Sequence, residues 1–517
     1  MKDASKHPMN GEKMSELPPK EEEQKQEKPK EYETIENQIL EVIKVQWEQH
    51  EEIREILSIL KEKILLDLNS LGYAGRVELQ GSFVRKTYLS EDETFDLLLI
   101  LHQSDRSKVH QILDAILKRL KSDRVRKSPI SVSKHTGKIP YLRILVDGEL
   151  VNLFVGFEVS PGEETISIFD LIPKHTQYII THMREEDRNE VILLKKFVKT
   201  IGVYRNEIGA VGFNGYLCEL LILFYGSFRE AMKGISKWRA RTIIDLKKKI
   251  EKIEDVDLLT SEMLFRYYPL YVQDPLNPKD NVAADVSMDQ FLSLIAAANT
   301  FLFKPSTSFF EDLLCEVPTY DELVRKIFSS GREVAILAIE RNFLETEVGW
   351  QKALAIKSAF ESEIINNNYI LERSKAFVSD EYYGILVSLM DANPQISIRR
   401  DGPEITSADS LEFLKRYGKH VDVVAGPYID NGRWAINFRK KGQKIIDFLE
   451  NLVKKNTFVL NVDSFLRIEI KEKMKVLEID EKLQEIYETD TSFAESFFLF
   501  IERKPLWICN LKEAEVL

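Results

Sequence analysis

The sequence contains little cysteine and no long apolar run. Its three cysteines, Cys218, Cys315 and Cys509, are too far apart for the paired spacings of zinc, iron–sulfur or dithiol sites. No window holds the roughly 18 uncharged apolar residues of a membrane-spanning helix, and the N-terminus lacks the basic and apolar regions of a secretory signal. We therefore expect a cytoplasmic protein with reduced thiols.

Positive charge is not in excess either. Lys and Arg together number 72 against 84 Asp and Glu, which gives a formal net charge of −12. A chain of this charge is not suited to coating nucleic acid nonspecifically, because the whole molecule repels a polyanion. Any contact with RNA must be confined to a local basic region.

The length of 517 residues exceeds what one hydrophobic core organises, so the sequence predicts several domains. Short strand-like apolar runs alternate with dense helical stretches, which indicates mixed α and β structure. We predict an α+β multidomain fold in four segments: a disordered charged N-terminal segment at 1–33, a helix with a small α/β domain at 34–165, a helical domain at 166–300 and an αβ region at 301–517.

The segment QGSFVRKTYLSEDETFDLLLIL, residues 80–101, combines a Gly-Ser turn with an apolar strand. Gly81 and Ser82 would let backbone N–H groups and a hydroxyl approach a triphosphate. Transfer of a nucleotide also needs carboxylates that hold divalent metal, and residues i and i+2 share a strand face, so the relevant positions are Thr94 and Asp96. A turn followed by an ordinary buried strand remains an alternative explanation of this segment.

Further segments resemble the archaeal-type (class I) tRNA CCA-adding nucleotidyltransferase family and follow the family's order. They are IPYLRILVDGELVNLFVGFEV, KHTQYI, LLKKFVKTIGVY, GFNGYLCELLILFYGSF, QDPLNPKDNVAADVS and GPYIDNGRW. The resemblance implies a polymerase β-like nucleotidyltransferase head, a helical central neck, and αβ body and tail domains that hold the acceptor and T arms of tRNA. It also implies CTP and ATP as substrates, Mg²⁺ as the metal of an active member, and a homodimer as a frequent assembly.

The catalytic positions depart from that family pattern. Of three metal-binding carboxylates only Asp96 remains, while Thr94 and Asn152 occupy the other two positions. Loss of two negative charges removes most of the attraction for a divalent ion, so we expect Asp96 to bind metal weakly. Glu93 or Asp147 could substitute only through a bulge or a register shift.

The nucleotide-binding positions are partly retained. The resemblance implies nucleotide contacts for six residues, Gly81, Ser82, Arg85, His175, Lys195 and Tyr204. Lys86 stands where the family has glycine, and Asp280 stands where the family has an arginine that recognises the nucleotide. An anion in place of a forked cation repels phosphate. If catalysis is lost, His175, Lys195 and Tyr204 could serve ordinary packing or surface roles instead.

Two basic segments are candidates for RNA contact. The first supplies Arg433, Trp434, Arg439, Lys440 and Lys441. Phosphate and aromatic contacts of this kind need no catalytic carboxylate. The second, residues 236–253, is predicted to be a basic helix, and a solvated charged helix face explains it equally well.

Three functions remain open from the sequence. The chain is a tRNA-binding relative with lost or strongly reduced nucleotide transfer, or an active enzyme with a rearranged metal site, or a protein-interaction scaffold that no longer binds RNA. The altered positions Thr94, Asn152 and Asp280 favour the first, while the sequence leaves open whether the protein is an enzyme. The first two differ in magnesium-dependent transfer, and the first and third in salt-dependent RNA binding.

Overall fold

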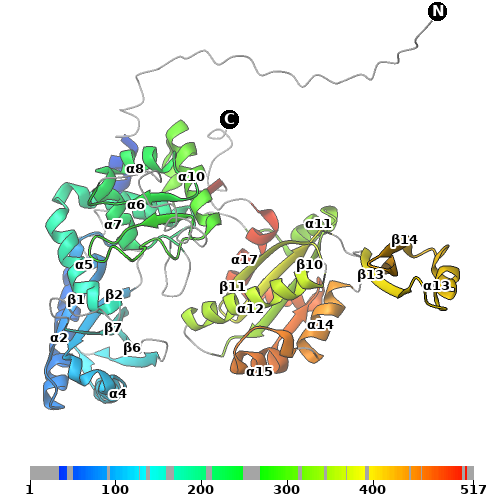
Figure 1. Cartoon of the computed structure of the whole chain (residues 1–517). Coiled ribbons are helices and arrows are strands. Elements are labelled where there is room, and N and C mark those ends of the chain that lie inside the picture. Colours follow the sequence, from blue (N-terminus) through cyan, green and yellow to red (C-terminus); the bar gives the residue numbers. More distant parts are fainter. Residues whose placement is uncertain are drawn as a thin grey trace, which may run out of the picture.

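The computed structural model describes most of the chain beyond the N-terminal segment. The described residues are 34–42, 50–89, 94–126, 128–135, 140–158, 168–204, 212–248, 268–311, 317–342, 346–367, 369–390, 395–441, 444–455, 457–503 and 507–508. The predicted disordered segment 1–33 lies outside them. We call residues 50–158 the head, 168–311 the neck, 317–390 with 444–503 the body, and 395–441 the tail (Figure 1).

The head is a sheet of five strands in the order β1-β2-β7-β6-β5. The strands are β1 (Gly75–Gln80), β2 (Thr94–Leu101), β5 (Ser131–His135), β6 (Tyr141–Val146) and β7 (Glu149–Phe157), and the short hairpin β3 (Arg124–Val125) and β4 (Ser128–Pro129) lies apart from them. One face packs on α2 (His50–Ser70) and α4 (Val109–Leu120) through a buried apolar cluster. Along β2 the side chains alternate between that core and the opposite face, which carries Asp96.

The neck is mainly helical and packs around an aromatic core. Its helices are α5 (Ile168–His182), α6 (Glu185–Thr200), α7 (Gly215–Tyr225), α8 (Phe228–Ile235) and α10 (Met288–Phe303), with the 3₁₀ turn η2 (Thr307–Phe309). Phe197, Phe228 and Phe301 stack edge to face in the centre. The residues of α5 also reach the head, where Phe169 stacks on Phe154 of β7. The neck therefore closes over the sheet face that carries Asp96.

The predicted basic helix at 236–253 is wrong for the part that the structure describes. Thr242–Ile244 forms strand β8, which pairs in parallel with β9 (Leu270–Val272). The run Thr-Ile-Ile is β-branched and fully buried, so it favours a strand over the helix that the surrounding lysines indicated. Lys249 and the residues after it lie outside the described part.

The body is a four-stranded antiparallel sheet between two helical layers. The sheet order is β11-β12-β10-β16, with β10 (Glu333–Glu340), β11 (Leu371–Val378), β12 (Tyr382–Leu389) and β16 (Lys475–Leu477). One layer holds α12 (Thr346–Asn366), α14 (Ile445–Lys455) and α15 (Ser464–Lys473), with η3 (Thr457–Val459), and the other holds α11 (Tyr320–Ser329), α16 (Glu481–Thr489) and α17 (Thr491–Glu502). Apolar clusters on both faces of the sheet pack it against the two helical layers.

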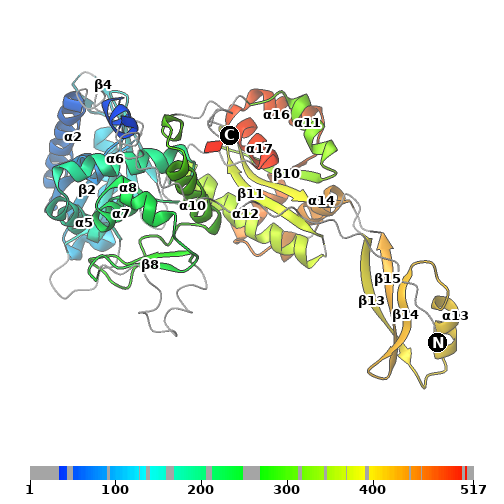
Figure 2. The same cartoon turned by 90° about the horizontal axis from the view of Figure 1, so that it is seen from above.

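The tail projects from the body as a small separate module (Figures 1 and 2). It comprises β13 (Gln395–Glu404), α13 (Ser410–Tyr417), β14 (Val423–Asp430) and β15 (Arg433–Lys441), in the sheet order β13-β15-β14. Few of its side chains are buried, and many described residues of the two outer strands, β13 and β14, are exposed to solvent. The prediction of an α+β multidomain fold is confirmed, and among the described helices none has the length and apolarity required to cross a membrane.

Candidate functional site

The strand register of the head places two of the predicted catalytic positions, Asp96 and Asn152, side by side. Asp96 on β2 lies opposite Asn152 on β7, and Asn152 lies opposite Arg143 on β6. Residues that pair across neighbouring strands share a face. The three side chains therefore form one polar row, Asp96–Asn152–Arg143, on the face that α5 approaches.

Hydrogen bonds fix the orientation of the amide in this polar row. Arg143 Nε donates to Asn152 Oδ1 at 3.3 Å, and Asn152 Nδ2 donates to Asp96 Oδ1 at 3.4 Å. A guanidinium can only donate and an ionised carboxylate can only accept, so the amide oxygen must face Arg143. The amide consequently turns its hydrogens toward Asp96, where a metal ion would require an oxygen.

Thr94 adds no charge to this sheet face. Its partner on β7 is Leu150, whose partner on β6 is Leu145, and 46% of Leu145 is exposed. Across the described residues no group of three or more His, Cys, Asp or Glu side chains is placed to hold a metal ion. The donor set at Thr94, Asp96 and Asn152 does not fit magnesium, which binds through several charged or carbonyl oxygens in octahedral geometry.

Asp147 does not replace the lost carboxylates. It sits in the β6–β7 hairpin turn with a backbone φ of 56°, followed by Gly148 at 88°. Its carboxylate accepts a hydrogen bond from the Ser128 hydroxyl at 2.8 Å and lies 3.9 Å from Arg126. Asp96 pairs with Asn152, which lies five residues beyond Asp147 in the sequence. The pairing of β2 with β7 contains no bulge that would bring Asp147 into the row. Glu93, the other candidate, lies outside the described residues.

The Gly-Ser turn lies directly against the remaining carboxylate. Gly81 begins α3 (Gly81–Arg85) with φ +81°, and a Cβ on it would stand 3.1 Å from Asp96 Oδ2. Lys86 ends this helix in the left-handed region, with φ 59°. That conformation costs a non-glycine residue about 1 kcal/mol, and it is the position where the family pattern has glycine. The backbone shape of the turn is retained despite the change of residue.

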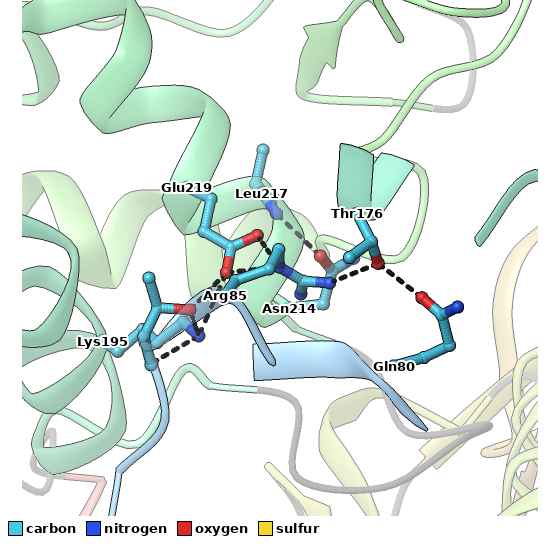
Figure 3. Close-up of polar contacts among 8 residues, drawn as sticks. Gln80, Arg85, Thr176, Lys195, Asn214, Leu217 and Glu219 are labelled. Atoms are coloured by element: carbon cyan, nitrogen blue, oxygen red, sulfur yellow. Dashed lines mark hydrogen bonds and ion pairs between the residues drawn. The ribbon is translucent and has the colours of Figure 1, made fainter. Parts of the chain in front are cut away.

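Arg85 and Lys195 both point into a buried network around Glu219 (Figure 3). Arg85 Nε lies 2.9 Å from the Glu219 carboxylate, and Lys195 Nζ lies 3.7 Å from it. Lys195 also donates to the Thr87 carbonyl at 2.8 Å, and Thr87 donates its hydroxyl to Glu219. Lys195 and Glu219 are fully buried, so Lys195 is not the surface residue that we considered as an alternative.

The charge of Glu219 is stabilised by its partners. Burial acts to raise its pKa, but the charges of Arg85 and Lys195, with hydrogen bonds from Arg85 and Thr87, hold the pKa of Glu219 below its usual range. The Glu219 carboxylate on α7 therefore stays ionised although it is buried. It ties the Gly-Ser turn of the head to two helices of the neck, α6 and α7.

The same network extends to the sheet through α5. Arg85 donates to the Thr176 hydroxyl at 3.4 Å, and Thr176 donates to Gln80 Oε1 at 2.7 Å (Figure 3). Gln80 is the residue opposite Asp96 on β1. A continuous set of buried polar contacts thus links the neck to the edge of the polar row.

His175 and Tyr204, the other predicted nucleotide contacts, occupy separate places in the neck. The imidazole of His175 lies 2.8 Å from Asp274 Oδ2, and both residues are buried. Burial opposes the ionisation of Asp274, but the bond to His175 and two backbone N–H groups keep the pKa of Asp274 below its usual range. Tyr204 and Lys195 both lie close to Gly215, where an added Cβ would stand 3.0 Å from Tyr204 Oη and 3.1 Å from Lys195 Nζ.

Asp280 lies on the exposed loop between β9 and α10. Its carboxylate accepts a hydrogen bond from Asn277 Nδ2 at 2.8 Å. Burial is the main cause that raises the pKa of Tyr271, and the negative charge of Asp280 raises that pKa further. It forms no ion pair among the described residues. The loop therefore presents an anion where the family pattern has a cation.

The predicted RNA-contact residues divide between the two faces of the tail sheet. Arg433 and Arg439 are exposed on one face of β15, whereas Trp434 is half-buried on the other, where Phe438 packs on Tyr417 of α13. Arg433 Nε donates to the Gly402 carbonyl at 3.1 Å, which gives it a structural role as well. The side chains of Lys440 and Lys441 lie outside the described residues.

Sequence reasoning missed Glu219, Asp274 and Arg143. Two of them had a signal: Glu219 is a single acid within the apolar run YLCELLILF, and Arg143 is a single cation within the strand YLRILV. A charge at such a position requires a buried partner. The identity of the partner could not be read, because it depends on contacts between distant segments.

Two described family models match parts of the neck and the body, together with the tail. The model of the family "tRNA nucleotidyltransferase, second domain" matches residues 189–311, and that of "CCA-adding enzyme, C-terminal domain" matches residues 354–478. The chain is similar to the CCA-adding enzyme of Methanocaldococcus jannaschii, with 28% identity over 82% of this chain and 89% of that protein. It is also similar to the CCA-adding enzyme of Sulfurisphaera tokodaii, with 34% identity over 54% of this chain and 61% of that protein.

Similarity to solved structures is looser. A structure of a cytoplasmic RNA terminal U-transferase matches 54% of this chain and 98% of its own, with 12% sequence identity and a TM-score of 0.41. A structure of the Cid1 poly(U) polymerase matches 54% of this chain and 99% of its own, with 12% identity and a TM-score of 0.42. At these TM-scores the likeness carries no argument about the site.

The buried network predicts a specific loss of stability. Replacement Glu219→Gln removes the charge that offsets Arg85 and Lys195, and breaking a buried ion pair on one side costs about 3 kcal/mol or more. We expect that decrease in the free energy of unfolding in urea titrations at neutral pH. The control Glu185→Gln alters a carboxylate whose side chain is 80% exposed, for which a change below about 1 kcal/mol is expected.

The pH dependence of this difference has a defined sign. Because the folded-state pKa of Glu219 is lowered, its charge stabilises the fold above the unfolded value of about 4.3. The stabilisation is lost as the pH falls through the lower, folded value. The gap between wild type and Glu219→Gln should therefore be constant near neutrality and shrink in acid, and a gap that widens in acid would contradict this role.

Proposed function

Because the chain belongs to the family of the archaeal CCA-adding nucleotidyltransferases, we propose that it is a tRNA-binding member whose nucleotide transfer is lost or strongly reduced. The tRNA acceptor and T arms are the proposed partner, and binding is proposed to involve the body and tail. We also propose a homodimer, because the family resemblance implies it as a frequent assembly.

One observation carries the proposed loss of transfer. Asn152 donates its amide hydrogens to Asp96 and presents its oxygen to Arg143. Transfer in this family of folds uses divalent metal held by carboxylates, and a two-metal clamp stabilises both the attacking and the leaving oxygen. The row Asp96–Asn152–Arg143 has one negative and one positive charge, so it offers little attraction to a divalent ion.

The proposed RNA binding is supported by the structure of the neck, body and tail, outside the polar row. The neck and body have complete apolar cores, and the tail presents exposed arginines on one face of its sheet. Arg399 on this face is neutralised by Asp401 and Asp430, whereas Arg439 has no ion-pair partner among the described residues. Arg439 is therefore the tail cation best placed for a phosphate contact.

The transfer assay tests the proposal against an active enzyme with a rearranged metal site. With labelled CTP or ATP, magnesium and tRNA that lacks its 3′ end, we expect incorporation at least about 100-fold below that of an intact relative, since several kcal/mol of charge stabilisation are missing. Incorporation at the relative's rate would contradict the loss of transfer and favour the active alternative.

Restoring the carboxylates should restore metal binding. The double variant Thr94→Asp with Asn152→Asp should bind Mn²⁺ at the head at least about tenfold more tightly than wild type does, because two charged oxygen ligands are added. Electron paramagnetic resonance of free Mn²⁺ measures this directly. The isosteric control Thr94→Val should leave Mn²⁺ affinity unchanged, and equal affinity of the double variant and wild type would show that the row is not the limiting feature.

RNA binding separates this proposal from a scaffold that no longer binds RNA. We expect gel shifts with tRNA to weaken as salt rises, and Arg439→Ala to weaken binding about three- to tenfold and to reduce the salt slope by about one. The control Arg54→Ala changes an exposed arginine of the head helix α2, paired with Glu51, and should have no effect. Absence of a shift at low salt would favour the scaffold.

A further inference from the structure

A small cavity of about 110 Å³ lies in the body, on the side of its sheet that α11 and α17 cover (Figure 2). It is lined by the C-terminal ends of these two helices, the start of β10 and the end of β12. Three lining residues are cations, Lys326, Arg332 and Arg503. All three lie outside residues 189–311 and 354–478, the segments that the two family models match. The cavity shares no lining residue with the candidate site on the head.

The two arginines of the cavity share a single carboxylate oxygen. Arg332 Nε lies 3.1 Å and Arg503 Nη2 lies 2.6 Å from Glu372 Oε2. The same oxygen accepts a hydrogen bond from the Ser388 hydroxyl at 2.9 Å. A guanidinium has five N–H donors, and neither arginine side chain has another polar partner within the part of the chain that the structure describes. Most of their donors therefore remain available.

Two further cations stand behind the cavity wall on β11. Arg373 lies opposite the lining residue Ser388, and its guanidinium is 5.4 Å from the centre of the ring of the lining residue Phe500. Lys375 is the next residue on the same strand face. Neither cation forms an ion pair among residues whose placement is described. Positive charge thus extends from the cavity into the sheet.

The acids around this cluster do not balance its cations. Burial lowers the pKa of Arg373, and the charge of Arg503 lowers it further, against a smaller opposite effect of Asp289 on α10. Burial also lowers the pKa of Lys375 to about 8, and the charge of Arg373 acts in the same direction. Glu502 is paired with Lys326. Five cations therefore face three carboxylates, Glu372, Glu502 and Asp289, which leaves a surplus of two positive charges.

We propose that this cavity binds a free tetrahedral oxyanion of the phosphate class, held by the unused donors of Arg332 and Arg503 and by the ammonium of Lys326. A dianion matches the surplus of two charges, and the planar fork of arginine suits two oxygens of one anion. The cavity is well below the roughly 300 Å³ or more of pockets that hold drug-sized ligands, so a nucleotide is too large for it. This site goes beyond the proposed function, because it requires neither tRNA nor nucleotide transfer.

Lysine footprinting of the full chain tests the proposal. With N-hydroxysuccinimidyl acetate at about pH 8, where phosphate is mainly a dianion, mass spectrometry gives the acetylation rate of each lysine. Saturating inorganic phosphate should slow acetylation of Lys326 about fivefold or more, because the bound oxyanion covers its amine and stabilises the charged form. Lys233 on α8 is the matched control, since its side chain is 50% exposed against 53% for Lys326 and each is paired with one glutamate. Its rate should not change.

A set of variants assigns the protection to the cavity. Arg332→Gln should raise the phosphate concentration for half-protection of Lys326 about tenfold, because one guanidinium is removed. Arg332→Lys keeps the charge without the fork and should fall between this variant and wild type. Arg325→Gln removes an exposed arginine of α11 that does not line the cavity and should have no effect. Urea titration shows that each variant is folded, and Arg503→Gln replaces Arg332→Gln if the latter is not.

The choice of anion decides between a site and general screening. Sulfate, another tetrahedral dianion, should protect Lys326 as phosphate does, whereas acetate and chloride at equal ionic strength should not. The proposal is overturned if phosphate gives no protection, if chloride or acetate protects equally, or if Arg332→Gln is protected like wild type. Protection by tRNA without protection by phosphate would assign the cations to RNA and overturn it as well. The tRNA gel shift and the transfer assay are separate readouts, so the proposed function can stand when this proposal fails.

Discussion

Strand register is the constraint on which the chemistry of the head depends. Because β2, β7 and β6 are adjacent and in register, whatever stands at residues 96, 152 and 143 must share one face and interact. Substitution of one carboxylate by Asn152 thus changes more than a charge count. It gives Asp96 and Arg143 an amide that satisfies a donor on one side and an acceptor on the other.

A second constraint holds the head to the neck independently of catalysis. Glu219 gathers Arg85, Thr87 and Lys195 from three elements, and none of these groups can lose its partner without leaving a buried charge or donor unpaired. Two residues that the family pattern assigns to the triphosphate, Arg85 and Lys195, therefore also stabilise the fold of this chain. This stabilising role explains their presence in the sequence and does not require transfer activity.

Sequence reasoning predicted the α+β multidomain fold class, and its failures have physical causes. The apolar run in TFDLLLIL located β2, and the i, i+2 spacing placed Thr94 and Asp96 on one strand face. The misassigned strand β8 lies among lysines, whose helical preference concealed a buried β-branched triplet. The partners of Glu219 and Arg143 come from segments far apart in the sequence, so only the tertiary fold could identify them.

The distribution of the changes argues against a general decay of the chain. A protein under no constraint would lose apolar core residues and turn glycines along with its charges, yet the cores of head, neck and body are continuous. Even Lys86 preserves the left-handed turn that a glycine would adopt more easily. Thr94 and Asn152 instead place uncharged side chains beside Asp96, and Asp280 places an anion on the loop before α10. The apolar cores that hold the fold are therefore kept, while the charges at the predicted metal and nucleotide positions differ from the family pattern.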